Sequence, residues 1–210
     1  MREFPTLELE NMLSGEGVEY VAGVDEAGRG PVAGPVTAAA VVFSISKTGF
    51  SYGRFGGEVR DSKLIPEKKR ESIAAEIKER ALAFSIAHVP NEMIDSINIL
   101  NATRLAVIQA VESLKVKPQV VLIDGKFLNL KNFTCISVVK GDLNIFSIAA
   151  ASILAKTSRD ALMRNYALDF PHYSFERNKG YLTDQHLQAI RNYGLSPIHR
   201  RSFSINCRTS

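Results

Sequence analysis

The chain has 210 residues, of which 45% are hydrophobic, and it carries a formal net charge of +4. This length suits one domain, or one domain with a small appendage, and the apolar content is sufficient for a packed core. No apolar run approaches the roughly 20 residues of a membrane span, and the two cysteines, Cys135 and Cys207, are too few for a disulfide framework. We therefore expect a reduced, cytoplasmic protein that does not associate with membranes.

The hydrophobic pattern alternates between strand and helix periods along the chain. In chain order it predicts a helix over 5–14, strands over 19–25 and 36–43, a glycine-rich loop or hairpin over 44–60, a helix from Pro66 to about Ala83, a strand over 84–89, a helix over about 98–115, strands over 119–124 and 134–139, and helices over about 144–166 and 183–193. Such alternation is typical of an α/β protein with a mixed sheet covered by helices. We expect residues 1–170 to form this body and residues 171–210 to pack on it as a small C-terminal helical appendage.

Two adjacent carboxylates, Asp25 and Glu26, end the first predicted strand. Two acids at a strand end gather negative charge where a hard cation can bind. The turn that follows contains Gly28, Arg29 and Gly30. Glycine lets the backbone approach a ligand closely, and arginine offers a planar donor fork that suits phosphate. The stretch therefore predicts a combined metal and phosphate site.

Two further acids are candidates for the same site. Asp124 ends a second hydrophobic strand, and sites in open α/β sheets form beyond strand ends. It can therefore lie beside Asp25, although an ordinary turn aspartate would give the same pattern. On the long helix, Ser152, Lys156 and Asp160 are spaced by four residues and share one face. This polar stripe belongs either to the site or to a solvated face with a Lys156–Asp160 pair.

Basic and aromatic residues elsewhere suit a nucleic acid. Residues 171–210 hold six basic and two acidic residues and so account for the whole net charge. Such asymmetry favours an anionic partner, although a solvated basic surface would look the same. Within this segment, Tyr181 follows a glycine, and Arg200 and Arg201 precede a phenylalanine; aromatic and basic groups together suit stacking and phosphate contact. The hydroxyl and amine of Asp61-Ser62-Lys63 can hold one phosphate.

Together these motifs resemble those of the ribonuclease HII family. The resemblance rests on segments in the family's order: Val24-Asp25-Glu26-Ala27-Gly28-Arg29-Gly30, Asp61-Ser62-Lys63, Ile123-Asp124-Gly125, Val139-Lys140-Gly141-Asp142, Ala149–Lys156 with Arg159-Asp160, Lys179-Gly180-Tyr181 and His199-Arg200-Arg201-Ser202-Phe203. They span nearly the whole chain, and any one of them alone would be weak. The related ribonuclease HIII has a glutamate as its fourth acid, so Asp160 favours ribonuclease HII.

The resemblance implies a ribonuclease H-like fold and endonucleolytic cleavage of the RNA strand of RNA/DNA hybrids, including single ribonucleotides embedded in duplex DNA. It implies four catalytic, metal-binding acids: Asp25, Glu26, Asp124 and Asp160. It further implies that the Gly28-Arg29-Gly30 turn reads the ribose 2′-hydroxyl and that Tyr181 lies against the sugar on the DNA side of the junction. The remaining expected substrate contacts are Ser62, Lys63, Lys140, Arg200 and Arg201.

The expected chemistry follows from the charges of the four acids. Carboxylates this close repel one another, and we expect two Mg²⁺ or Mn²⁺ ions, roughly 3.5–4 Å apart, to neutralise them. One ion would activate water and the other would stabilise the leaving 3′-oxygen, which gives 5′-phosphate and 3′-hydroxyl ends. Discrimination of RNA from DNA must use the 2′-hydroxyl. We expect a monomer to suffice for this reaction.

Two other functions fit parts of the same pattern. Another two-metal nuclease of this fold, such as a resolvase, would share the acids but cut four-way junctions. A non-catalytic module that binds hybrids would share the basic segment. Four clustered acids disfavour the second alternative, because negative charge gives no advantage to a protein that only binds phosphate.

Overall fold

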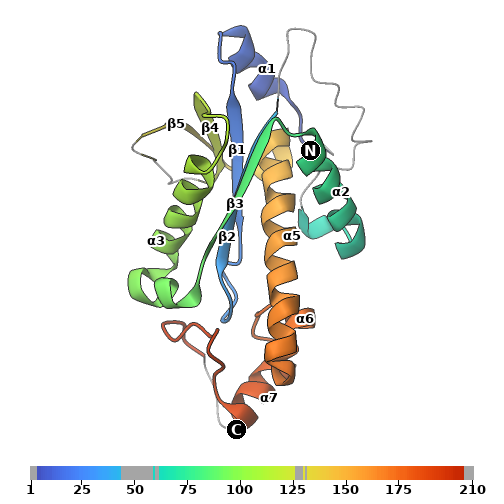
Figure 1. The fold of residues 1–210 in the computed structure, drawn as a ribbon, viewed down its shortest axis with the longest axis vertical. Coiled ribbons are helices and arrows are strands. Elements are labelled where there is room, and N and C mark those ends of the chain that lie inside the picture. Colours follow the sequence, from blue (N-terminus) through green and yellow to red (C-terminus); the bar gives the residue numbers. More distant parts are fainter. Residues whose placement is uncertain (1–3, 44–58, 60–61, 126–129, 131, 206–210) are drawn as a thin grey trace.

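The computed structural model describes residues 4–43, 59, 62–125, 130 and 132–205 (Figure 1). Its elements in chain order are α1 (Glu8–Gly15), β1 (Val21–Ala27), β2 (Val36–Val42), the 3-10 turn η2 (Ser62–Leu64), α2 (Glu67–Arg80), β3 (Ala83–Val89), α3 (Asn91–Glu112), β4 (Val120–Asp124), β5 (Thr134–Val138), α4 (Gly141–Asn144), α5 (Phe146–Asp169), the 3-10 turn η3 (Pro171–Tyr173), α6 (Phe175–Asn178) and α7 (Asp184–Tyr193). Strands and helices alternate, as the sequence pattern predicts.

The described strands form one mixed sheet in the order β3-β2-β1-β4-β5. β1 pairs antiparallel with β2, and β2 pairs antiparallel with β3. On its other side β1 runs parallel to β4, and β4 runs parallel to β5. The carboxyl ends of β1, β4 and β5 therefore meet at one edge of the sheet, which is where ligand sites of open α/β sheets form. The expected α/β class with a mixed sheet is confirmed.

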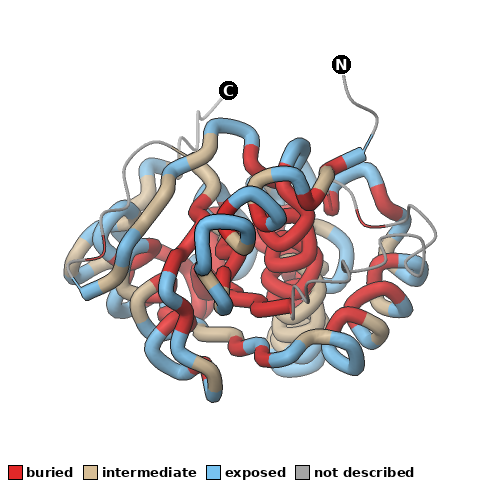
Figure 2. The backbone as a smooth tube through the Cα atoms, turned by 90° about the horizontal axis from the view of Figure 1, so that it is seen from above, coloured by how far each residue is buried: buried red, intermediate tan, exposed pale blue. Residues whose placement is uncertain are grey.

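Helices cover both faces of the sheet (Figure 1). β2 shows why, because its residues are buried alternately against one face and the other, as the two-residue period of a strand requires. Ala38, Ala40 and Val42 pack with α3, whereas Ala39 and Val41 pack with α2 and α5. Figure 2 shows the resulting core, with buried residues in the strands and the adjoining helix and exposed residues at the periphery. In the part of the chain that the structure describes, no helix has the length and apolarity to cross a bilayer.

α5 lies unusually close to β1. A Cβ atom on Gly23 would stand only 2.1 Å from the carbonyl carbon of Ser147 in the first turn of α5, so only glycine permits this approach. The buried carboxylate of Glu10 accepts the backbone N–H of Ser147 at 3.0 Å and so satisfies one free donor at the start of α5. Burial raises the pKa of Glu10 above its ordinary value, and the hydrogen bond from Ser147 opposes that effect.

Most boundaries shift by a few residues from the predicted ones, among them the end of α2, and the start of α3 shifts further. α2 ends at Arg80, and β3 already begins at Ala83, which the sequence assigned to the helix. α3 begins at Asn91 rather than near Asn98, and it is kinked at Asn98, whose φ is 65°. The Asn98 side chain accepts the backbone N–H of Asn101 at 3.1 Å, which is an N-cap contact that starts the second half of the helix. The predicted start is therefore the start of that half, and the loop predicted over 44–60 lies almost entirely outside the described residues.

The C-terminal segment joins the body through a separate hydrophobic cluster. Tyr173, Phe175 and Ile190 pack there with Met163 of α5 and Ala33. Backbone hydrogen bonds add to this packing, since the N–H of Gly34 donates to the carbonyl of Ile198 and Ala33 forms an antiparallel bridge with His199. The division into a body over 1–170 and an appendage over 171–210 stays a prediction.

Replacement of Gly23 by alanine should destabilise the fold. The added Cβ would meet backbone atoms of α5 within 2.5 Å, and neither β1 nor α5 can yield without disturbing the core. We expect the free energy of unfolding to fall by about 2–3 kcal/mol, which is the upper part of the usual range for overpacking. The melting temperature should fall by roughly 5–10 °C. Gly15→Ala is the matched control, because a Cβ there meets nothing within 4 Å. Equal melting temperatures for the two variants would contradict the close approach.

Candidate functional site

Four acids converge at the carboxyl ends of three parallel strands. Asp25 and Glu26 belong to the end of β1, and Asp124 ends the neighbouring strand β4. Asp142 follows β5 in the short helix α4. All four line one cleft of about 480 Å³. The other residues that line it are Ala27, Gly28, Arg29, Gly30, Ser62, Lys63, Arg70, Ser152, Lys156, Arg159 and Tyr181.

The acids of the cleft repel one another. Burial raises the pKa of Asp25 well above its ordinary value, and the charges of Glu26 and Asp124 raise it further. Burial also raises the pKa of Glu26, although the nearby guanidinium of Arg29 counteracts the effect. These carboxylates resist ionisation chiefly because they are buried, and the repulsion between their charges adds to this effect.

Two serines connect the floor of the cleft to Asp25. The hydroxyl of Ser152 on α5 donates to the Asp25 carboxylate and lowers its pKa, which opposes the effect of burial. The Ser62 hydroxyl lies 3.0 Å from that of Ser152. Because Ser152 uses its proton toward Asp25, Ser62 is the donor of this bond. Ser62 is therefore buried in the floor of the cleft, whereas its neighbour Lys63 is exposed at the rim.

Asp142 is the acid that sequence reasoning missed. It is largely buried, and the exposed amine of Lys63 lies 3.9 Å from its carboxylate. The residue before it, Gly141, donates its backbone N–H to Asp124 Oδ1 at 2.6 Å, which ties α4 to the end of β4. A usable signal was present, because Asp142 follows closely after a strand, β5, and acids also lie at the ends of β1 and β4. Only Lys140 was selected from this segment.

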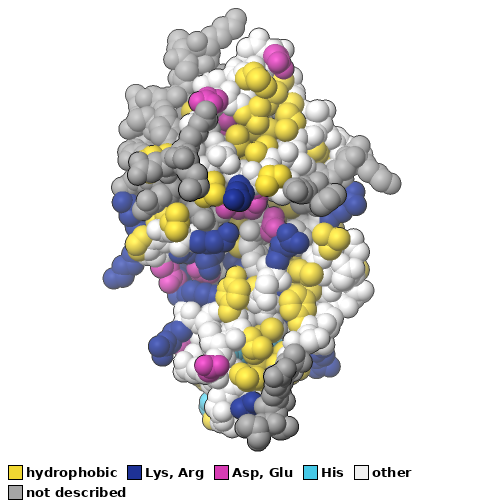
Figure 3. All heavy atoms as spheres, turned by 180° about the vertical axis from the view of Figure 1, so that it is seen from behind, with side chains coloured by type: hydrophobic (Ala, Val, Ile, Leu, Met, Phe, Trp, Pro, Cys, Tyr) yellow, Lys and Arg dark blue, Asp and Glu magenta, His cyan; other side chains and the backbone are white. Residues whose placement is uncertain are grey.

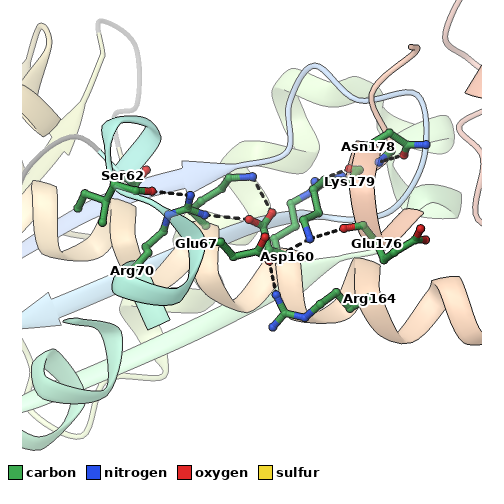
Figure 4. Close-up of polar contacts among 12 residues, drawn as sticks. Ser62, Glu67, Arg70, Asp160, Arg164, Glu176, Asn178 and Lys179 are labelled. Carbon is green, nitrogen blue, oxygen red and sulfur yellow. Dashed lines mark hydrogen bonds and ion pairs between the residues drawn. The ribbon is translucent and has the colours of Figure 1, made fainter. Parts of the chain in front are cut away.

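Asp160 does not line the cleft. Its two carboxylate oxygens are engaged by cations: Oδ2 accepts Arg70 Nη1 at 2.9 Å, and Oδ1 accepts Lys156 Nζ at 2.6 Å. Figure 4 shows Asp160 on α5 facing Arg70 of α2. Asp160 therefore contacts two cations that line the cleft, and its expected role as the fourth metal-binding acid stays a prediction. The Lys156–Asp160 pair exists, but Asp160 is buried rather than solvated.

Arg70 and Lys156 themselves line the cleft. Asp160 therefore fixes two cations beside the acids, and burial lowers the pKa of Lys156 although its bond to Asp160 opposes this. Further ion pairs link α2 to α5 and to the C-terminal segment, since Glu67 binds both Arg164 and Lys179 (Figure 4). On the face in Figure 3, basic side chains surround acidic ones near the middle of the molecule.

The glycine turn and Tyr181 form the other wall of the cleft. Gly28 has a φ of +92°, and an added Cβ would lie 2.1 Å from Arg159 Nε, so this position requires glycine. Gly30 faces the ring of Tyr181, because a Cβ on Gly30 would stand 3.6 Å from the ring. Tyr181 is 49% exposed and free to contact a ligand. The structure thus brings both predicted ribose contacts to one place.

The two arginines of the basic patch predicted near the C-terminus differ in exposure. Arg201 is exposed, but Arg200 is fully buried. The Arg200 guanidinium donates to the backbone carbonyls of Gly28, Arg29, Gly34 and Pro35. In this structure its donors therefore face the backbone of the turn, and its expected contact with a phosphate stays a prediction. Neither Arg201 nor the exposed Lys140 lines the cleft.

The donor set of the cleft fits hard divalent cations. Carboxylate oxygens are the ligands that Mg²⁺ and Mn²⁺ prefer, and burial, together with the charges of Glu26 and Asp124, raises the pKa of Asp25. Among the described residues, no three acidic, histidine or cysteine side chains yet converge closely enough to hold one ion. The acids therefore share one cleft without already forming a complete set of ligands for one ion.

Comparison with known proteins identifies the family of the chain. The family model described as ribonuclease HII matches residues 22–206. A ribonuclease HII of Ligilactobacillus salivarius (strain UCC118) is 47% identical over 197 residues, which cover 94% of this chain and 74% of that protein. The crystal structure of ribonuclease H2 from Pyrococcus horikoshii OT3 superposes with a TM-score of 0.71 at 27% identity and covers 88% of this chain and 93% of that one.

A more distant structure, titled Bst-RNase HIII in complex with Mn²⁺, has a TM-score of 0.58 at 19% identity over 83% of this chain and 63% of that one. It shows a shared fold and no more. The family match, in contrast, covers nearly the whole chain, including every strand-end acid. The chain therefore belongs to the ribonuclease HII family and is a nuclease of the ribonuclease H type.

Proposed function

We propose that this protein cuts the RNA strand of RNA/DNA hybrids and cuts at single ribonucleotides embedded in duplex DNA, which leaves 5′-phosphate and 3′-hydroxyl ends. The observation that carries the proposal is the composition of one cleft. Four acids line one part of it, and a glycine turn with an exposed tyrosine lines another. All of these groups come from one chain, which supports action as a monomer.

The proposed metal ligands are Asp25, Glu26, Asp124 and Asp142. The first three are those that the sequence predicted, and Asp142 replaces Asp160 because it shares their cleft. Two divalent ions, Mg²⁺ or Mn²⁺, bound there would activate a water molecule and stabilise the leaving 3′-oxygen. The Mn²⁺ named for the distant ribonuclease HIII structure agrees with this choice of ion.

The residues around the acids would bind and orient the nucleic acid. Lys63 and Arg29 are exposed cations at the rim of the cleft and would contact phosphates. The backbone of the Gly28–Gly30 turn would contact the ribose 2′-hydroxyl, the group that distinguishes RNA from DNA. The Tyr181 ring beside Gly30 would lie against the adjacent sugar. Arg201 and Lys140 would extend this contact over the neighbouring surface.

Cleavage mapping on a duplex with one embedded ribonucleotide tests the proposed function. We expect one cut at the ribonucleotide, a dependence on Mg²⁺ or Mn²⁺, and no cut in the same duplex made entirely of DNA. Preference for a four-way junction would identify a resolvase instead. Binding of hybrids without turnover in any divalent metal would identify a non-catalytic module.

Asp142→Asn should abolish cleavage while the protein stays folded. The substitution removes one proposed ligand charge, and we expect a loss of more than about 100-fold, because even partners outside the first ligand sphere cost 10–100-fold. Calorimetric titration with Mn²⁺ should show weakened binding.

Asp160→Asn is the matched comparison. It leaves Arg70 and Lys156 without their buried partner, so it should lower the free energy of unfolding by about 3–5 kcal/mol but retain Mn²⁺ binding below its melting temperature. If instead Asp160→Asn loses the metal and Asp142→Asn keeps it, the proposed ligand set is wrong.

Alanine at Gly30 should mainly lower the cleavage rate, whereas alanine at Gly28 should mainly lower the melting temperature. A Cβ on Gly30 makes only an ordinary contact of 3.6 Å with Tyr181, so Gly30→Ala should melt like the wild type. It intrudes on the proposed ribose surface, however, and small misplacements can cost about 100-fold in rate. Gly28→Ala should lower the melting temperature, because its φ of +92° and its contact with Arg159 exclude a side chain. A fully active Gly30→Ala would remove the turn from the ribose site.

A further inference from the structure

Arg200 is a fully buried arginine whose hydrogen bonds, within the described residues, all end on backbone carbonyls. Nε donates to Gly34 O at 2.9 Å, and Nη1 donates to Arg29 O at 3.1 Å. Nη2 donates to Gly28 O at 2.6 Å and to Pro35 O at 3.1 Å. One planar guanidinium therefore holds both limbs of the turn that lines the cleft.

These bonds also fix the direction of the amides on the turn. The carbonyls of Gly28 and Arg29 share their peptide planes with the N–H groups of Arg29 and Gly30. The described peptides are all trans, and in a trans peptide the N–H points opposite to the C=O. Because both carbonyls point toward buried Arg200, both N–H groups point away from it, on the side of the turn where Arg29 and Gly30 are exposed. Neither N–H donates a hydrogen bond within the described part of the chain.

His199, the residue before Arg200, is connected through His186 to Tyr181 on the other wall of the cleft. His199 forms a strand-like bridge with Ala33, so its side chain and that of Arg200 leave the backbone on opposite sides. His199 Nε2 lies 3.0 Å from His186 Nε2, and His186 Nδ1 lies 2.8 Å from the carbonyl oxygen of Tyr181. Both histidines are buried.

The partners of these rings determine which nitrogens carry protons. The Tyr181 carbonyl can only accept, so His186 donates from Nδ1 and accepts at Nε2. His199 must then donate from Nε2, and its Nδ1 accepts from the backbone N–H of Ser196 at 2.8 Å. Burial lowers the pKa of His199 to about 4, and the neighbouring His186 lowers it as well. Two neutral rings thus form a directed chain of hydrogen bonds that ends on Tyr181.

We propose that His199 and Arg200 together position the two ribose-facing groups of the cleft, the amides of Arg29 and Gly30 and the ring of Tyr181, and so determine how strongly the protein prefers ribose to deoxyribose. This inference rests on the proposed function. It assigns Arg200, His199 and His186 as positioning residues, since none of these side chains lines the cleft. Rigid placement matters here because one 2′-hydroxyl is the only difference between the two sugars.

The test compares binding of a duplex that contains one ribonucleotide with binding of the same duplex in which that sugar is deoxyribose. Affinities are measured in Ca²⁺ without cleavage, and their ratio is the ribose preference. Arg200→Lys keeps the charge but replaces the rigid fork by a single ammonium group. We expect the ribose preference to fall about tenfold, the effect of about one lost hydrogen bond, with unchanged affinity for the all-DNA duplex.

Two controls separate positioning from general stability. Ile190→Val shortens a buried side chain of the same C-terminal cluster without contact to the turn, and Arg191→Lys changes an exposed arginine of the same segment. Both should keep the wild-type preference. An unchanged preference in Arg200→Lys, or an equal fall in Ile190→Val, overturns the inference.

His186→Phe tests the same unit from the Tyr181 side and decides the question if Arg200→Lys does not fold. It keeps a buried ring but removes the donor to Tyr181, so the ribose preference should again fall, and an unchanged preference would refute the inference. A wild type without any ribose preference would contradict the proposed function itself. A wild type that prefers ribose, with variants that keep this preference, would refute the positioning role alone.

Discussion

The parallel pairing of β1, β4 and β5 places like charges side by side, and much of the structure around them responds to that constraint. Asp25 lies near the end of β1, Asp124 ends the adjacent strand β4, and Asp142 follows the third strand, β5. Carboxylates at such a strand edge are stable only with compensation, because burial and mutual repulsion both disfavour their charge. The cations Arg29 and Lys63 lie at the edge of this group and reduce the repulsion. In the proposed function, divalent ions bound among these acids would neutralise them further.

A second group of charged residues, buried next to the cleft, holds the side chains and backbone of its wall in place. Asp160 holds Arg70 and Lys156 in place, and Arg159 and Arg200 both donate to the carbonyl of Pro35. These buried guanidiniums bind backbone dipoles, so they shape the chain instead of attracting ligands. Removal of one partner from such a network leaves buried polar groups unsatisfied, which costs more than the net energy of the bond itself. The C-terminal segment is therefore part of the wall of the cleft.

Sequence reasoning predicted the strands and three of the acids because these depend on local patterns. A hydrophobic run followed by an acid and a glycine identifies Asp25 and Asp124 without any knowledge of the fold. The choice between Asp142 and Asp160 depends on tertiary structure, since each lies in a plausible local context. Only the pairing of β5 with β4 shows that Asp142 reaches the cleft, and only the position of α2 shows that Arg70 engages Asp160. The burial of Arg200 could not be predicted from the sequence either, because a pair of arginines near a chain end usually indicates an exposed surface.

The central claim is that Asp25, Glu26, Asp124 and Asp142 hold the catalytic metal. The most direct measurement is anomalous diffraction from crystals of the protein with Mn²⁺ and a hybrid duplex, because the anomalous signal locates the ions independently of activity. The structure predicts Mn²⁺ peaks among these four carboxylates, with Asp160 still bound to Arg70 and Lys156. A peak coordinated by Asp160, with Asp142 outside the ligand sphere, would contradict the account.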